Sequence, residues 1–132
     1  MTRRAADLWE RAKKALTVAK AVVALDPDSS ASRAYYAAFY AVSARFALEG
    51  KAFRKHSTLE AAIHRDLVKG GMWPVERGEG FSRLAEVRSI GDYGEGEHIS
   101  AASAAEAIAI AAGILQAIAQ EQPDIFTGRD AL

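Results

Sequence analysis

The segment between Ala34 and Leu48 limits the possible folds of this chain most strongly, because it is apolar on every side of a helix. Its only charged residue is Arg45. Aromatic and branched side chains form one stripe, while tyrosines and alanines cover the other sides. A helix that is apolar all round is buried all round. We therefore predict a helix from Ser29 or Ser30, either of which is a good N-cap, to Glu49. It should lie at the centre of the fold or against a second subunit.

Four further helices are predicted from apolar residues that recur every three or four positions, at about 4–25, 58–69, 80–90 and 100–121. Proline and glycine mark the connections, with Pro27 after the first helix, an irregular glycine-rich loop over 70–80, and a break at Gly91 before a second loop. No strand is convincing. The expected fold is an all-α, up-and-down bundle of four to five helices. It should form a single domain over 1–132, in which about 123–132 is a frayed tail.

Composition excludes several classes of site. The chain has no cysteine, which rules out disulfides, cysteine zinc ligands and a cysteine nucleophile, and fits a reducing cytoplasm. The three histidines, His56, His64 and His98, do not have the spacing of a metal motif, and there is no phosphate-binding glycine loop. We expect no metal and no cofactor.

Charge and hydropathy are unevenly distributed. Residues 101–119 carry only Glu106, but most of them are alanine, so we predict a packed helix of a soluble protein rather than a membrane span. Residues 1–66 have a net charge of +5 and residues 67–132 of −5. This asymmetry indicates a nucleic-acid-facing side or attraction between subunits, unless the folded bundle interleaves the two halves.

Arg88 is the most informative candidate residue. It occupies the next position on the stripe of Phe81 and Leu84, so its guanidinium should be partly buried and require a partner. The partner could be an acid on another helix, or a phosphate, which suits guanidinium geometry. Asp92 and Tyr93 follow the predicted break, where Asp92 could pair with Arg88 and Tyr93 could stack on a base.

A second group of candidates precedes Arg88 in the chain. Arg33 and Tyr36 lie on one side of the central helix with Tyr40. The loop before the third helix contains Phe53, Arg54, Lys55 and His56, a combination of cations and an aromatic ring that is usual in contacts with single-stranded nucleic acid. The tyrosines could equally be core aromatics, and the loop could simply be solvated.

Three motifs in series carry a resemblance to a known family. They are Ser32-Arg33-Ala34-Tyr35-Tyr36-Ala37-Ala38-Phe39, then Lys55-His56-Ser57, then Arg88 with Gly91-Asp92-Tyr93. Together they resemble the small stand-alone prokaryotic branch of the HEPN domain (higher eukaryotes and prokaryotes nucleotide-binding). The resemblance implies a helical bundle that forms a homodimer, and a nucleotidyltransferase as partner in a toxin–antitoxin module. Many HEPN proteins are metal-independent endoribonucleases, in which an R-x4–6-H motif from each subunit acts on RNA.

This chain departs from the nuclease motif, because Asp92 and Tyr93 follow Arg88 where a histidine is expected. The first histidine after Arg88 is His98, and nine residues separate the two. His56 is the other candidate for proton transfer. Our leading hypothesis is a HEPN component of a toxin–antitoxin or defence module that could act as a metal-independent endoribonuclease at a dimer interface. The candidate catalytic residues are Arg88, His56, Tyr93 and Asp92, and the candidate RNA- or nucleotide-binding residues are Arg33, Tyr36, Lys55 and Arg54.

Two alternatives remain open. The first is a non-catalytic module that binds a nucleotide or docks a nucleotidyltransferase. The second is a helical adaptor without a ligand, whose melting temperature no phosphate compound would raise.

Overall fold

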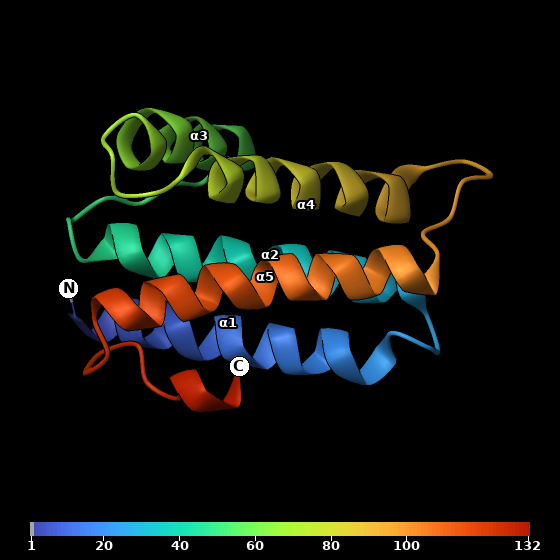
Figure 1. The fold of residues 1–132 in the computed structure, drawn as a ribbon, viewed down its shortest axis with the longest axis horizontal. Coiled ribbons are helices and arrows are strands. Elements are labelled where there is room, and N and C mark those ends of the chain that lie inside the picture. Colours follow the sequence, from blue (N-terminus) through green and yellow to red (C-terminus); the bar gives the residue numbers. More distant parts are fainter. Residues whose placement is uncertain (1) are drawn as a thin grey trace.

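The computed structural model describes residues 2–132, and within them it contains only helices and their connections. The long helices are α1 (Thr2–Val22), α2 (Pro27–Ala47), α4 (Val75–Tyr93) and α5 (Ala101–Glu121). They run alternately in opposite directions, and the short α3 (His56–Ala62) lies at one end of the bundle (Figure 1). A π-helical segment, η1 (Ile63–Val68), continues α3, and a 3-10 turn, η2 (Arg129–Ala131), lies near the C-terminus. The all-α, up-and-down bundle predicted from the sequence is confirmed.

Helix α2 is the central element, as its uniform hydrophobicity predicts. It packs against α1, α4 and α5, and most of its residues from Ala34 to Ala47 are buried. Its start differs from the prediction, since the N-cap is Asp26 rather than a serine. The Asp26 side chain accepts a hydrogen bond from the backbone N–H of Ser29 at 3.3 Å. Pro27 occupies the first turn, where a backbone N–H would have no partner within the helix, so the N–H that proline lacks is not missed.

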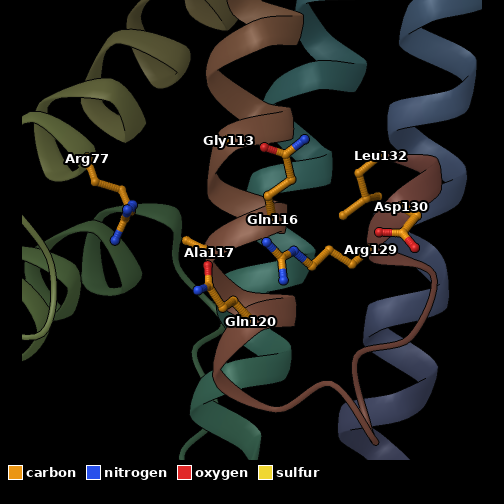
Figure 2. Close-up of a pocket in the computed structure, with 8 residues that line it drawn as sticks. All are labelled: Arg77, Gly113, Gln116, Ala117, Gln120, Arg129, Asp130 and Leu132. Atoms are coloured by element: carbon orange, nitrogen blue, oxygen red, sulfur yellow. The ribbon is translucent and has the colours of Figure 1, made fainter.

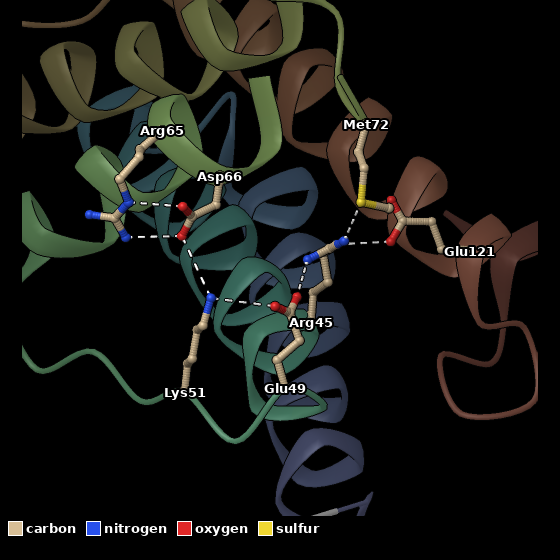
Figure 3. A network of polar contacts seen from close by, with 7 residues as sticks. All are labelled: Arg45, Glu49, Lys51, Arg65, Asp66, Met72 and Glu121. Carbon is tan, nitrogen blue, oxygen red and sulfur yellow. Dashed lines mark hydrogen bonds and ion pairs between the residues drawn. The ribbon is translucent and has the colours of Figure 1, made fainter. Parts of the chain in front are cut away.

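Arg45, the lone charge of the apolar stretch, is buried and fully partnered (Figure 3). Its Nη1 lies 2.8 Å from Glu49, its Nε lies 2.9 Å from Glu121 of α5, and its Nη2 contacts the Met72 sulfur at 2.9 Å. Glu49 is shared with Lys51, which also approaches Asp66 of η1. A buried charge is tolerated only when it is paired and hydrogen-bonded, so this network ties α5 and η1 to the end of α2.

The C-terminal residues pack against α1, and the prediction of a frayed tail at 123–132 is wrong. Phe126 is fully buried, and its ring lies 5.2 Å from that of Trp9. Trp9 Nε1 donates a 2.8 Å hydrogen bond to the carbonyl of Thr127. A short polar segment is ordered here because one large apolar side chain and one indole donor anchor it.

Helix α4 is longer at both ends than predicted, because its glycines serve packing rather than ending the helix. A Cβ on Gly78 would come within 2.7 Å of Val68 in η1, and one on Gly80 within 3.0 Å of Ile110 in α5. The helix also continues through Gly91, where a Cβ would approach the Asp28 carbonyl oxygen to 3.1 Å. The predicted break at Gly91 is therefore wrong, and Asp92 and Tyr93 belong to the last turn of α4 rather than to a loop.

The remaining helices follow the sequence more closely. The third helix begins at His56 instead of Thr58, so this histidine lies in its first turn and not in the loop. Gly71, at φ +87°, ends the segment, as expected for a glycine in the left-handed region. Ser100 caps α5 by accepting a hydrogen bond from the Ser103 N–H at 3.0 Å. Within 2–132, α5 is the one helix long and apolar enough to span a membrane by length and composition, but it packs on α2, α4 and α1 as part of the bundle.

Candidate functional site

The C-terminal half of α4 faces α2, and Arg88 lies at this contact with its guanidinium turned inward. Its side chain is 19% exposed. Nη2 donates a 3.0 Å hydrogen bond to the Tyr36 hydroxyl. Nε is 3.0 Å from Asp92 Oδ2, one turn along α4. The buried Nε of Arg88 makes no hydrogen bond of good geometry, so its pairing with the Asp92 carboxylate is mainly electrostatic. The predicted pairing of Arg88 with Asp92 is thus present, within one helix and not between two.

Three aromatic rings surround the same guanidinium. Its carbon lies 5.4 Å from the ring centre of Tyr35, 5.3 Å from that of Tyr36 and 5.6 Å from that of Tyr93, within the range of cation–π attraction. Burial by itself lowers the pKa of Arg88, but the hydroxyls of Tyr36 and Tyr93 and the Asp92 carboxylate together raise it. The Arg88 side chain therefore stays charged although most of it is buried.

His56 lies on the same tyrosines from the other side. Its Nδ1 is 2.5 Å from the Tyr35 hydroxyl. Its ring stacks on Phe39 at 4.5 Å and on Tyr35 at 5.5 Å, and it meets the Tyr36 ring edge-on at 5.7 Å. His56 and Arg88 thus share Tyr35 and Tyr36 as neighbours, although the two residues come from α3 and α4.

The tautomer of His56 follows from the environment of Tyr35. The Tyr35 side chain is 1% exposed, and burial raises the pKa of its phenol, so the hydroxyl keeps its proton and requires an acceptor. Its hydrogen-bond partner is His56 Nδ1. We therefore assign the proton of the neutral imidazole to Nε2, which makes Nε2 a donor. Burial, and then the charge of Arg88, lower the pKa of His56 below its ordinary value of 6.5, so the ring is neutral at pH 7.

The other predicted site residues divide into two groups. Arg33 joins the cluster, because its guanidinium carbon lies 4.8 Å from the Tyr36 ring centre on the side of α1. Tyr93 is 70% exposed and forms its outer edge. Arg54 and Lys55 are exposed on the segment before α3, and within 2–132 they make no ion pair or side-chain hydrogen bond.

Sequence reasoning missed Tyr35 and Phe39 as members of the site and assigned them to the core stripe. Both are core residues, yet the edge of Tyr35 carries the hydroxyl that orients His56. Their proximity to His56 depends on how α3 crosses α2, which periodicity does not report. The signal available was their place in the motif around Tyr36.

The two other histidines have structural roles. His98 Nδ1 is 2.8 Å from Asp28 at the start of α2, and the Asp28 carboxylate also accepts the Ile99 N–H at 2.7 Å. These two contacts lower the pKa of Asp28, the Ile99 bond more strongly, and they fasten the loop before α5. His98 is therefore a partner of Asp28 and has no hydrogen bond to Arg88, Asp92 or Tyr36.

His64 lies beside a serine and a carboxylate, but not in the order of a nucleophilic triad. Its Nε2 is 3.0 Å from Ser82 Oγ, whose own proton is donated to Glu60 at 2.6 Å. The histidine must then donate to the serine, so it cannot accept the serine proton. Among residues 2–132, no three His, Asp or Glu side chains converge as a metal site would require.

A separate hollow of about 470 Å³ lies between α5, the start of α4 and the C-terminal turn (Figure 2). Arg77 and Arg129 approach it from opposite sides, and Gln116 and Gln120 of α5 line it between them. None of the predicted site residues takes part, so this hollow is distinct from the cluster around Arg88.

Comparison with known proteins agrees with the resemblance in the sequence. A model of the HEPN domain matches residues 5–122. A UPF0332 protein of Thermotoga maritima is 38% identical over 114 residues, which are 85% of this chain and 86% of that protein. A UPF0332 protein of Gloeobacter violaceus is 33% identical over 119 residues, 88% of this chain and 94% of that protein.

Proposed function

Because this chain belongs to the HEPN domain family, we propose that it is the HEPN component of a prokaryotic toxin–antitoxin or related defence module. In this proposal, the cluster around Arg88 and His56 binds a phosphate group of RNA or of a nucleotide. One observation carries this proposal. A charged guanidinium and a neutral imidazole lie on the same pair of tyrosines, Tyr35 and Tyr36. We place the protein in the cytoplasm and expect a homodimer, since HEPN domains commonly form dimers.

The chemistry of the cluster suits an anion. Arg88 Nη1 is not engaged by another side chain of 2–132, and His56 Nε2 carries a second donor. A guanidinium with a fixed orientation is well matched to phosphate oxygens. Tyr93, exposed at the edge of the cluster, offers a ring on which a base can stack. Asp92 partly neutralises Arg88, so a bound phosphate must compete with this carboxylate.

Binding is better supported than cleavage, because metal-free cleavage of RNA needs one group to accept the 2′-OH proton and one to protonate the leaving oxygen. In the assigned tautomer His56 Nε2 is a donor, and Nδ1 is occupied by Tyr35. Tyr93 stands at the first position that R-x4–6-H allows for the histidine, and Asp92 just before it is paired with Arg88. One subunit therefore lacks a free base at the cluster.

The test is binding of a fluorescently labelled RNA dinucleotide to the purified full-length protein in EDTA. Arg88→Ala should weaken binding at least tenfold, because it removes the central cation. Arg83→Ala is the matched control, since Arg83 lies on the same helix but is exposed and pairs with Glu86. If Arg88→Ala binds as tightly as the parent protein, the assignment of this site is wrong.

A second candidate, a metal-independent endoribonuclease, is favoured by the lowered pKa of His56, because a neutral imidazole can accept a proton after exchange of its tautomer. Arg88 would stabilise the transition state, and Lys55 and Arg33 would position the RNA backbone. Incubation with total RNA in EDTA from pH 5 to pH 9 separates the candidates. Cleavage that disappears in both Arg88→Ala and His56→Ala supports the nuclease, and intact RNA at every pH supports the binding module.

The partner is expected to be a minimal nucleotidyltransferase, as in other HEPN modules. Co-expression with the product of the adjacent reading frame tests this directly. A stable complex with a nucleotidyltransferase would support the module, and an unrelated neighbour that does not bind would contradict it.

A further inference from the structure

A basic groove lies beside the candidate site, between α1 and α2. It has a volume of about 390 Å³ and is lined by Arg11, Lys14, Ala15 and Val18 of α1 and by Arg33 and Tyr40 of α2. We call it the α1/α2 groove. Three of its six lining residues are cations and none is acidic, so its electrostatic potential favours an anionic ligand.

The cations of the groove are available to a ligand. Within residues 2–132, Arg11, Lys14 and Arg33 form no salt bridge, whereas the neighbouring Lys13 pairs with Glu10 at 2.8 Å. Arg45 and Arg65 likewise have acidic partners. The groove therefore collects positive charge that the fold itself does not neutralise.

Aromatic rings alternate with these cations. The guanidinium carbon of Arg11 lies 5.9 Å from the Tyr40 ring centre, and that of Arg33 lies 4.8 Å from the Tyr36 ring centre. The Tyr36 and Tyr40 rings are 5.9 Å apart. Cations that follow a backbone, together with rings on which bases stack, are the usual composition of a surface for single-stranded nucleic acid. An acidic protein segment would match the cations but would not need the rings.

The groove is continuous with the candidate site through Tyr36. This residue contacts Arg33 on the groove side, and its hydroxyl accepts the hydrogen bond from Arg88. The path from Arg11 through Tyr40 and Tyr36 to Arg88 thus has three steps of 5 to 6 Å. Since stacked nucleotides rise about 3.4 Å each along a strand, the path is long enough for roughly five nucleotides.

We propose that the α1/α2 groove binds the single-stranded RNA that flanks the phosphate held at Arg88. This inference rests on the proposed function and extends it, because it makes the ligand an RNA strand of several nucleotides rather than a free nucleotide. Arg11 and Lys14 contact successive phosphates, and Tyr40 stacks on a base between them.

The experiment compares labelled oligouridines of two and twelve nucleotides with the full-length protein in EDTA, by fluorescence anisotropy at several salt concentrations. The twelve-mer should bind at least tenfold more tightly than the dinucleotide. The double variant Arg11→Ala/Lys14→Ala should lose this advantage and reduce the slope of log K against log salt by about 1.4, since each lost contact with a single strand contributes about 0.7. Its affinity for the dinucleotide should not change.

Three further comparisons separate charge from stacking. The control double variant Arg4→Ala/Lys20→Ala removes the same charge from α1 outside the groove, and it should bind the twelve-mer as the parent does. Tyr40→Leu, which keeps bulk without a ring, should weaken the twelve-mer at least fivefold, whereas Tyr40→Phe should retain its affinity. Inorganic polyphosphate, which has charge but no bases, should compete poorly.

The outcomes distinguish this inference from the proposed function. If the twelve-mer binds no better than the dinucleotide, or if both double variants weaken it equally, the groove does not bind RNA, whatever Arg88→Ala shows. If polyphosphate competes as well as RNA, the groove accepts polyanions such as an acidic protein segment, and the inference is wrong. If only the twelve-mer binds, and its binding depends on the groove but not on Arg88, the groove binds RNA, but the proposed function fails and with it the claim that this RNA flanks a phosphate at Arg88.

Discussion

The hydrogen bond between Tyr35 and His56 can be removed with little change of shape by replacing Tyr35 with Phe. The hydroxyl lies 2.5 Å from Nδ1, and the Tyr35 ring is buried and stacked on the imidazole. The substitution leaves the ring in place and deletes only the proton donor. It therefore tests the assignment of the His56 tautomer, on which the preference for binding over cleavage depends.

The expected loss of stability follows from the burial of the two groups. A neutral hydrogen bond contributes about 0.5–1.5 kcal/mol net, and a buried acceptor left without a partner costs about 1–3 kcal/mol. His56 is only partly buried, so water can reach some of its ring. We expect the free energy of unfolding at pH 8 to fall by about 1–2 kcal/mol. Tyr40→Phe is the matched control, because the Tyr40 hydroxyl has no hydrogen bond within 2–132, and it should change stability by less than about 0.5 kcal/mol.

The substitution should also change how stability depends on pH. The pKa of His56 is lower in the folded protein than its ordinary value of 6.5. As the pH falls below 6.5, the unfolded chain binds the proton more readily than the folded chain, and the free energy of unfolding decreases. Loss of the Tyr35 donor destabilises the neutral imidazole, so the folded pKa rises toward 6.5. The pH dependence becomes shallower, and the difference between variant and parent is smaller at pH 5 than at pH 8.

Urea unfolding at the two pH values and NMR titration of the His56 ring measure these effects. The refuting result is a pKa of His56 that falls in Tyr35→Phe. In that case Nδ1 carries the proton and donates to the Tyr35 oxygen, since loss of an acceptor disfavours the charged ring. Nε2 would then be a free base, and the endoribonuclease would become the better proposal.

Three further substitutions test the packing that positions the site. Arg45→Ala should destabilise the protein by about 2–3 kcal/mol in urea unfolding, because it leaves Glu121 unpaired and Glu49 with Lys51 alone, whereas Arg65→Ala, which breaks an exposed pair, should leave the stability nearly unchanged. Gly91→Ala should cost about 1–3 kcal/mol, because its Cβ meets backbone at 3.1 Å and overpacking strains such contacts. Phe126→Ala should cost about 3–5 kcal/mol and lower the melting temperature, and an unchanged melting temperature would show that the C-terminal segment does not pack on α1.

The helices could be predicted from the sequence because their information is local. Residues 34–48 form a helix that is apolar on all sides, so it must be buried wherever it lies, and α2 is indeed central. Ser100 was identified as the cap of α5 for the same reason, since a cap depends on neighbours within one turn. Local reasoning failed at Gly91, which has the composition of a break but provides close contact with Asp28.

The partial burial of Arg88 and its need for partners could be predicted without coordinates, because its position on an apolar stripe is a property of one helix. The family could be predicted as well, from motifs that follow one another in the chain. The groups that surround the guanidinium, and the contact by which Tyr35 orients His56, became known from the folded structure alone. The crossing of α3 and α4 over α2 sets these distances, and such crossings arise from side-chain packing between segments far apart in the chain, which no local pattern encodes.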